Sequence, residues 1–222
     1  MRSTKEGVSV TRYERTEPFV TYHRRYDDWF KRHEAAYLSE LLAVRALLPW
    51  EGTGLEIGVG TGRFAVPLGV AFGIDPAFPM LDYARARGVN VVSGVGEALP
   101  FANDLFNHVL IVTTICFSED VGATLAEARR VLRPGGWIII GFIDRESPLG
   151  LEYLTHQAEN VFYRDATFFS ASEVDALLAK CGFGERNWVQ TLSRPLAQVR
   201  NIEPVRPGTG HGAFLVVRAR TS

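Results

Sequence analysis

A glycine-rich turn follows the first short apolar run of the sequence. Residues 55–62 read Leu-Glu-Ile-Gly-Val-Gly-Thr-Gly, so glycines alternate with other residues directly after a run typical of a buried strand. Backbone that carries no Cβ atom can approach a ligand closely, and the helix start that follows offers free N–H groups to an anionic or polar ligand. The carboxylate of Glu56 can accept hydrogen bonds from such a ligand or from the loop's own amides. The turn predicts a ligand-binding loop.

An acidic residue stands at the end of the second apolar run. Asp75 follows Glu56 by roughly 20 positions, the distance at which nucleotide-binding βαβ units place a carboxylate that accepts hydrogen bonds from ribose hydroxyls. The alternative role is an N-cap for the helix that begins after Pro76. The two roles are compatible, and the spacing favours the ribose role.

Strands and helices must alternate to place this turn and this carboxylate at one edge of a sheet. Two segments, 78–87 and 121–132, have helical spacing of apolar residues. Between such segments lie Val- and Ile-rich runs that lack polar alternation, as in strands buried on both faces, at 55–59, 70–74, 89–95, 109–113 and 137–143. The alternation predicts a parallel sheet with right-handed crossovers. Two later runs, 187–192 and 213–220, predict an antiparallel pair at one edge.

The two flanks of this core have different patterns. Residues up to about 12 are polar and are expected to be loose, and residues 22–48 predict one helix that Pro49 ends. The segment 149–169 is aromatic and mixed, without a clean period. Ser170 and Glu173 then form a capping box that opens a helix running to about residue 180.

Four stretches, taken in this order, resemble the class I S-adenosylmethionine-dependent methyltransferases. They are residues 55–62, Asp75, Glu-Ala-Leu-Pro-Phe at 97–101 and Val-Leu-Arg-Pro-Gly-Gly at 131–136. The chain is similar to the small-molecule branch that includes the ubiquinone and menaquinone methyltransferases, over about residues 50–145. The resemblance implies a Rossmann-like, doubly wound α/β sheet of seven strands in the order 3-2-1-4-5-7-6. It also implies S-adenosylmethionine as cofactor and S-adenosylhomocysteine as product.

The resemblance assigns roles to the matching positions. The three turn glycines would pass under the methionine part of the cofactor, and Asp75 would bind its ribose. Met80 would cover the adenine, backbone near Gly96 would meet the adenine edge, and two threonines after the fourth strand would lie near the sulfonium. The expected cofactor-binding set is Glu56, Gly58, Val59, Gly60, Gly62, Asp75, Pro76, Met80, Gly96, Glu97, Thr113 and Thr114.

Two positions depart from the family pattern. Family members often carry an acidic residue that binds the adenine amino group where this chain has Val95, so adenine would be held by backbone at Gly96 and by packing, or Glu97 would substitute. The fourth strand usually opens with Phe-Asp, whereas this chain has Phe106 followed by Asn107. We expect a structural role for Asn107.

Methyl transfer from a sulfonium is a direct displacement that depends on alignment and exclusion of water, and it needs a general base only if the acceptor must lose a proton. His23, His33 and His156 are the candidates for such a base. Residues 1–49 would form an N-terminal helical cap on a cofactor-binding domain of residues 50–222, with a lid insertion at about 145–169. Aromatic rings of cap and lid suit a flat or cationic acceptor, and the expected acceptor contacts are Tyr22, Tyr26, Trp29, Tyr153 and Tyr163.

Composition and spacing argue against other functions. A net charge of -1 without an appended basic domain disfavours nucleic-acid and RNA- or protein-modifying roles. Two distant cysteines, with no metal-ligand spacing, no apolar signal core and no membrane-spanning stretch, predict a cytoplasmic enzyme without a metal; Cys116 is expected to be structural. An NAD-type oxidoreductase would need glycine where Arg63 stands. A non-catalytic protein that only holds the cofactor stays open beside a methyltransferase for a small-molecule acceptor.

Overall fold

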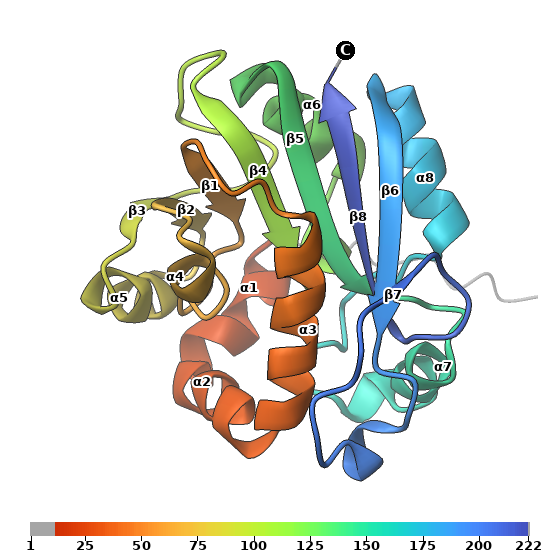
Figure 1. Cartoon of the computed structure of the whole chain (residues 1–222). Helices are drawn as coiled ribbons and strands as arrows, with labels where there is room; N and C mark the ends of the chain where they lie inside the picture. The colour runs from red at the N-terminus through yellow and green to blue at the C-terminus, as the bar shows by residue number, and fades with distance from the viewer. Residues whose placement is uncertain (1–11, 222) are drawn as a thin grey trace, which may run out of the picture.

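Eight strands form one sheet, in the spatial order β3-β2-β1-β4-β5-β8-β6-β7, in the computed structural model (Figure 1). The structure describes residues 12–221, with side chains from Arg15 onward; residues 1–11, expected to be loose, lie outside the described range. The strands are β1 (Gly54–Ile57), β2 (Phe72–Asp75), β3 (Asn90–Ser93), β4 (Phe106–Val112), β5 (Leu132–Ile143), β6 (Phe183–Thr191), β7 (Arg206–Pro207) and β8 (Phe214–Thr221).

Strand directions confirm the expected sheet and add one strand to it. Strands β1 to β5 are mutually parallel, β8 runs antiparallel to β5, and β6 runs antiparallel to β8. The first seven strands of the sheet follow the expected order 3-2-1-4-5-7-6, in which β8 corresponds to the strand numbered 7. Prediction of seven strands was wrong by one, because the two-residue β7 pairs with the edge of β6 and is too short to carry any hydrophobic pattern.

Helices cover both faces of the sheet (Figure 1). They are α1 (Arg12–Thr21), α2 (His23–Arg32), α3 (Glu34–Leu47), α4 (Ala65–Leu68), α5 (Phe78–Ala86), α6 (Val121–Val131), α7 (Pro148–Thr155) and α8 (Ala171–Lys180). Alternate residues of β4 point to opposite faces. Leu110 packs in the core layer under α3, and Ile111 packs in the layer under α6 and α8. Within residues 12–221, every helix is too short or too polar to cross a membrane.

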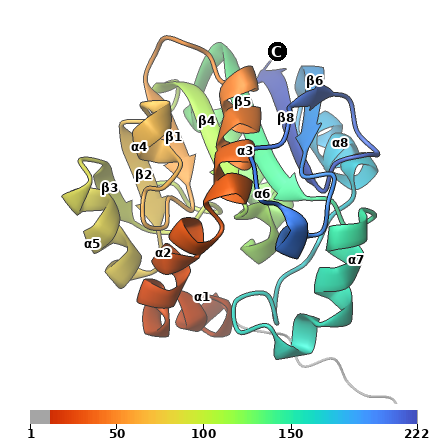
Figure 2. The ribbon, with the colours of Figure 1, turned by 60° about the horizontal axis from the view of Figure 1, so that its bottom comes forward.

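The N-terminal helical segment is not the single helix expected over residues 22–48. It begins at Arg12 and is divided into α1, α2 and α3 by non-helical backbone at Tyr22 (φ -111°, ψ 26°) and His33 (φ -119°, ψ 42°). The breaks change the chain's direction: α3 lies on the face of the sheet, whereas α1 and α2 lie beyond the carboxyl ends of the parallel strands (Figure 2). In the same view α7 lies beneath those strand ends on the other side.

Strand β5 starts earlier than the sequence pattern indicated. Helix α6 ends at Val131 and β5 begins at Leu132, so the Pro-Gly-Gly stretch lies inside the strand rather than between helix and strand. The pairing with β4 is irregular between Phe106 and His108, and Gly135 has a positive φ of 72°. A bulge of this kind lets a strand continue through residues that otherwise signal a turn.

Candidate cofactor and acceptor site

The glycine turn after β1 holds backbone that other residues cannot adopt without strain. Gly58, Gly60 and Gly62 have φ angles of 72°, 51° and 79°. A Cβ atom on Gly58 would overlap the Thr114 side chain, so this position needs glycine for space as well as for conformation. The N–H group of Gly58 donates to the carbonyl oxygen of Ile74 (2.8 Å), which fixes the turn against β2.

Asp75, at the end of β2, binds the turn through its carboxylate. Oδ2 accepts a hydrogen bond from the Gly60 N–H group and Oδ1 accepts one from Ala77, both at 2.9 Å. Burial raises the pKa of Asp75 to about 6, and the two N–H donors partly offset that effect. The N-cap of α5 is Ala77, so the bond to Ala77 forms just ahead of the helix. The carboxylate therefore supports the loop while still lining the adjoining cavity.

Glu56 lies in β1, directly before the glycine turn. It is 1% exposed, and its Oε2 atom has no hydrogen-bond partner. Burial holds the pKa of Glu56 well above its usual range, with a partial offset from the N–H group of Ala65. Together with Val59 and Gly62, Glu56 lies outside the cavity wall; Val59 instead packs against Gly73.

A cavity opens above the carboxyl ends of β1, β2 and β4, and we call it the cofactor cavity. The structure brings together nine of the expected cofactor-binding residues in its wall: Gly58, Gly60, Asp75, Pro76, Met80, Gly96, Glu97, Thr113 and Thr114. Helix α1 adds Arg15, Thr16 and Phe19, and α2 adds Tyr26, four residues of which sequence motifs gave no signal as cofactor neighbours. The N-terminal helices thus form part of the cavity wall.

Glu97 and Val95 both line the cofactor cavity. Oε1 of Glu97 accepts hydrogen bonds from the Ser118 hydroxyl and the Glu119 N–H group, both at 2.8 Å. Burial works against ionisation, but these donors outweigh it and lower the pKa of Glu97. The carboxylate thereby anchors the loop after β4 and remains charged at the cavity wall.

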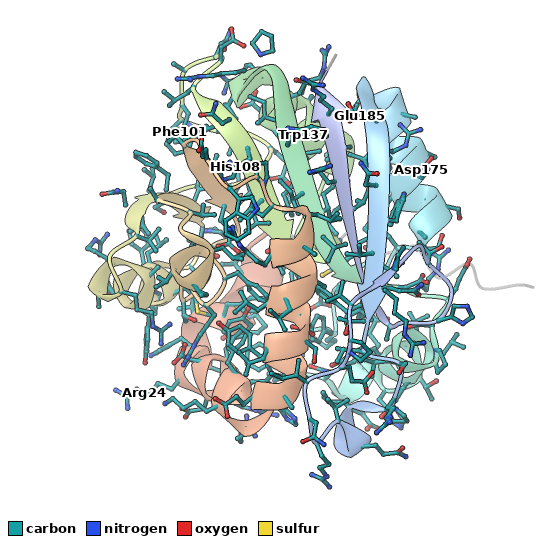
Figure 3. All side chains as sticks on the ribbon, viewed as in Figure 1. Arg24, Phe101, His108, Trp137, Asp175 and Glu185 are labelled. Atoms are coloured by element: carbon teal, nitrogen blue, oxygen red, sulfur yellow. The ribbon has the colours of Figure 1, made fainter. Side chains whose placement is uncertain are left out.

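Asn107 and Cys116, which were expected to be structural, have no catalytic geometry. Asn107 accepts a hydrogen bond from the Thr53 N–H group at 2.9 Å through its side chain, as expected. His108 lies in β4, far from α1 and α2, whereas Arg24 projects outward from α2 (Figure 3). Burial raises the pKa of the Cys116 thiol to about 12, so this cysteine stays protonated and is a poor nucleophile. Within the described residues, no cluster of His, Cys, Asp and Glu could hold a metal ion.

A second cavity, of about 460 Å³, adjoins the first, and we call it the acceptor cavity. Three residues, Phe19, Tyr26 and Thr113, line both cavities. Thr113 has a φ of 49°, which is costly for a β-branched residue, and its N–H group donates to the carbonyl oxygen of Gly141 (2.8 Å). Strained backbone is therefore held at the place where the two cavities meet.

Aromatic rings from separate elements pack together around the acceptor cavity. Phe19 of α1 contacts Tyr26 of α2 and Phe162, with ring centroids 5.6 Å and 5.4 Å away. Tyr153 of α7 lies 5.2 Å from Tyr163. Of the expected acceptor contacts, Tyr26, Trp29, Tyr153 and Tyr163 line this cavity, whereas Tyr22 is 41% exposed and lines neither.

One of the three candidate histidines lines the acceptor cavity, and the other two do not. His156 lines the acceptor cavity, and its Nδ1 lies 3.1 Å from the carbonyl oxygen of Glu152. His23 and His33 line neither cavity; their rings pack against Tyr83 and Trp29. Of the three, only His156 is placed to face an acceptor.

Ion pairs fasten α2 to the cofactor loop. The Asp27 carboxylate, in a residue only 4% exposed, accepts hydrogen bonds from Arg63 (2.9 and 2.6 Å) and Arg87 (2.9 and 2.8 Å). Burial alone would raise the pKa of Asp27, but the two guanidinium groups hold it well below its usual range. Arg63 is the residue that breaks the NAD-type glycine pattern, and its structural task is to hold the helix that carries Tyr26.

Glu40 of α3 is the acceptor-cavity residue that sequence analysis missed most clearly. It lines the cavity and is 5% exposed. The signal was present: Glu40 shares the buried stripe of α3 with Ala36, Val44 and Leu47, where an apolar residue would be expected.

The glycine turn, the carboxylate at the end of β2 and the cavity at the strand ends define a class of nucleotide-cofactor enzyme. The model for the methyltransferase domain matches residues 55–140. A solved structure from Thermotoga maritima, described as an S-adenosylmethionine-dependent methyltransferase and possible histamine N-methyltransferase, is 48% identical with a TM-score of 0.91. The similarity covers 93% of this chain and 100% of that one. The chain belongs to the S-adenosylmethionine-dependent methyltransferases.

Two curated relatives extend this comparison. An uncharacterised protein of Methanocaldococcus jannaschii is 42% identical over 201 residues, which is 90% of this chain and 97% of that protein. The demethylmenaquinone methyltransferase of a Roseiflexus species is 35% identical over 97 residues, covering 39% of this chain and 41% of that protein. The resemblance to the small-molecule branch is therefore confirmed, and the cofactor is S-adenosylmethionine.

The residues present fit this cofactor. Because the turn glycines carry no side chain, the backbone of the turn can lie directly beside the ligand. Asp75 offers carboxylate oxygens to ribose hydroxyls. Met80 and Val95 supply apolar wall for a flat base.

Proposed function

We propose that this enzyme transfers the methyl group of S-adenosylmethionine to a small molecule bound in the acceptor cavity. The observation that carries the proposal is the shared wall of the two cavities, formed by Phe19, Tyr26 and Thr113. Direct displacement needs the acceptor atom and the methyl group in contact and in line, which is possible only where the two cavities meet.

The size and cover of the acceptor cavity support a small acceptor. A volume of about 460 Å³ falls within the usual range for small-molecule sites, roughly 300–1,000 Å³. Elements α1, α2 and α7 contribute to its wall, and its aromatic lining excludes water from the reacting atoms. The Roseiflexus relative, named for demethylmenaquinone, supports a small-molecule acceptor by analogy.

Each part of the chain has a defined task in this reaction. When bound, the cofactor supplies a methyl group activated by a sulfonium. The turn and Asp75 hold the cofactor, while Phe19, Tyr26 and Thr113 orient the acceptor. Burial, followed by the charge of Asp75, holds the pKa of the Tyr26 phenol well above its usual range, so this group keeps its proton and serves as a hydrogen-bond donor. In this scheme residues 50–222 bind the cofactor, and α1, α2 and the insertion at about 145–169 cover the acceptor.

Calorimetric titration with S-adenosylmethionine and S-adenosylhomocysteine tests the cofactor site, with Asp75→Ala as the variant. We expect micromolar binding by the wild type and a loss of roughly 10-fold or more in the variant, because hydrogen bonds to a charged group are removed. A screen of amines, phenols and quinols for S-adenosylhomocysteine release then tests transfer. Cofactor binding without turnover on any acceptor would favour a non-catalytic protein, and hydride transfer with NAD would favour an oxidoreductase.

A further inference from the structure

Glu40 presents an unpartnered carboxylate to the acceptor cavity. The residue is 5% exposed. Within residues 12–221, no hydrogen bond or ion pair reaches its carboxylate. A buried carboxylate without a partner is strongly unfavourable, and native structures rarely keep one without a reason. Burial alone raises the pKa of Glu40 to about 8, because no donor or cation offsets it.

The other buried acidic residues of the described chain each have a partner on at least one carboxylate oxygen, although Oε2 of Glu56 and Oε1 of Glu203 accept no hydrogen bond. Asp27 pairs with Arg63 and Arg87. Oε2 of Glu203 accepts hydrogen bonds from the N–H group and hydroxyl of Ser193, at 2.6 and 2.8 Å. Glu40 differs from them because neither of its carboxylate oxygens has a partner among the described residues and because it lies in the wall of the cavity where we place the acceptor.

The surroundings of Glu40 favour a cation. Tyrosines 26, 153 and 163 of the cavity wall lie near enough for the Glu40 charge to help raise the pKa of their phenols, although burial is the larger cause. Trp29, Phe19 and Phe162 add further ring faces, which attract cations. A carboxylate surrounded by aromatic rings matches the chemistry of a protonated amine.

Other ionisable groups in the wall lie toward solvent. Arg25 and Arg32 of α2, and His156 and Glu159 after α7, are all exposed. The Arg25 guanidinium carbon lies 5.9 Å from the Phe162 ring centroid, and Arg32 donates to the backbone carbonyls of Asp28 and Arg25. Because water screens exposed charges, Glu40 sets the charge that a buried acceptor meets.

We propose that Glu40 is the acceptor-binding carboxylate of this enzyme and that the acceptor is a primary or secondary amine. This inference rests on the proposed function and deepens it by naming the substrate class. The ammonium form pairs with ionised Glu40 in the wall of the acceptor cavity, within reach of the charge interactions that Glu40 makes with Tyr26, Tyr153 and Tyr163. Charge pairing thereby selects amines over alcohols and acids of the same shape.

The same contact accounts for the proton that an ammonium must lose before it attacks. One N–H bond breaks, and its proton passes to a carboxylate oxygen of Glu40, which leaves a lone pair on nitrogen. That pair forms the new N–C bond to the methyl carbon, while the S–C bond breaks and its electron pair stays on sulfur. The products are a methylated ammonium and S-adenosylhomocysteine; Glu40 returns its proton to solvent between turnovers.

Calorimetry on the protein saturated with S-adenosylhomocysteine tests this proposal. The probes are matched sets that share a frame and differ in one group: 2-phenylethylamine, 2-phenylethanol and 3-phenylpropionate, and the corresponding butyl compounds. We expect the wild type to bind an amine more tightly than its matched alcohol and acid. Glu40→Gln should weaken amine binding by roughly 10- to 100-fold, the size of a lost charged hydrogen bond, and should leave alcohol binding unchanged.

Glu159→Gln is the matched control, because it removes a carboxylate from the exposed part of the same wall and should change amine affinity by less than about 3-fold. Proton release separates a charge-pairing role from a merely structural one. Near pH 7, amine binding should release a proton from wild-type Glu40 and none from Glu40→Gln, measured by calorimetry in buffers of different ionisation enthalpy. An unchanged affinity for S-adenosylhomocysteine shows that the variant is folded.

Three results would overturn the inference: equal amine affinity in wild type and Glu40→Gln, tighter binding of the alcohols or acids, or no binding of any amine probe. In each case turnover of a phenol or quinol in the acceptor screen would leave the proposed function standing. Failure of the wild type to bind S-adenosylhomocysteine would overturn both.

Discussion

The cofactor and acceptor cavities share a wall but are built in different ways. The cofactor cavity is made largely of backbone and short side chains from the ends of β1, β2 and β4, with positive φ angles at Gly58 and Gly60. The acceptor cavity is made mostly of large side chains from α1, α2, α3 and α7, and its one deeply buried acidic side chain is Glu40. One site depends on the conformation of a loop, and the other on the convergence of separate helices.

This difference indicates that substitutions can change specificity for the acceptor more readily than specificity for the cofactor. Backbone geometry at the glycine turn is fixed by the strands on each side, so the cofactor site tolerates little variation. The acceptor wall consists of side chains on elements beyond the sheet, and single substitutions there alter shape or charge without disturbing the strands. Variants in the two regions should therefore fail in different ways, from complete loss of cofactor binding to subtle shifts in acceptor choice.

The largest effect is expected for Gly58→Ala. The new Cβ would overlap Thr114 and force a residue with φ of 72° into strain, so affinity for S-adenosylhomocysteine should fall by roughly 100-fold or more. Calorimetry measures the loss. Gly69→Ala is the control, since Gly69 has the same φ but nothing within 4 Å of an added Cβ; it should lower stability by about 1 kcal/mol and leave affinity unchanged. Wild-type affinity in Gly58→Ala would refute the close packing of this turn.

Asp27→Asn should have the next largest effect. It leaves Arg63 and Arg87 without their shared carboxylate, and we expect a loss of about 3 kcal/mol in the free energy of unfolding at pH 7, measured with urea. Asp28→Asn, which removes only an exposed pair with Lys31, should cost less than about 0.5 kcal/mol.

The loss in the free energy of unfolding caused by Asp27→Asn should depend on pH. Because the pKa of Asp27 is lowered on folding, its contribution is present above the ordinary carboxyl pKa and is lost as pH falls below it. The difference between wild type and Asp27→Asn should therefore shrink under acid conditions. A difference that is constant from neutral to acid pH would contradict the ion-pair assignment.

The Glu40 carboxylate should produce the opposite pH dependence in the protein without an acceptor. Burial raises its pKa from 4.5 to about 8, because the charged form is less favourable in the folded protein than in the unfolded chain. The contribution of protonated Glu40 to the free energy of unfolding is therefore fully present below pH 4.5 and is lost as the pH rises through 8. Between pH 5 and pH 9, wild type should lose about 4 kcal/mol relative to Glu40→Gln in urea unfolding. Parallel curves for the two proteins would show that Glu40 is solvated.

The smallest effect is expected for Tyr22→Phe. Tyr22 is 41% exposed and lines neither cavity, so kcat/KM on an accepted substrate should stay within about 2-fold of wild type. Tyr26→Phe, on the next turn of the helical segment, should lower kcat/KM by roughly 10-fold, because the removed hydroxyl lies at the wall shared by the cavities. Equal effects would mean that α1 and α2 are placed differently when substrate is bound.

Much of the fold was predictable, because its signals are local. Buried parallel strands read as apolar runs, and the capping box at Ser170 marked the start of α8 with both of its hydrogen bonds. The breaks at Tyr22 and His33 were not predictable, since neither residue disrupts a helix by itself. They follow from tertiary contacts, including the pairing of Asp27 with Arg63 and Arg87.

The sequence by itself indicated the class of enzyme, and the resemblance to that class implied the sheet order. It also predicted the position of Asp75 beside the glycine turn, because both belong to one βαβ unit. Only the tertiary structure decided that Tyr26 rather than Tyr22 lines the cavities, and that Glu40 is buried in the acceptor wall. A helix sequence fixes which residues share a face but not what that face meets. That choice is made when α1, α2, α3 and the segment around α7 pack around one space.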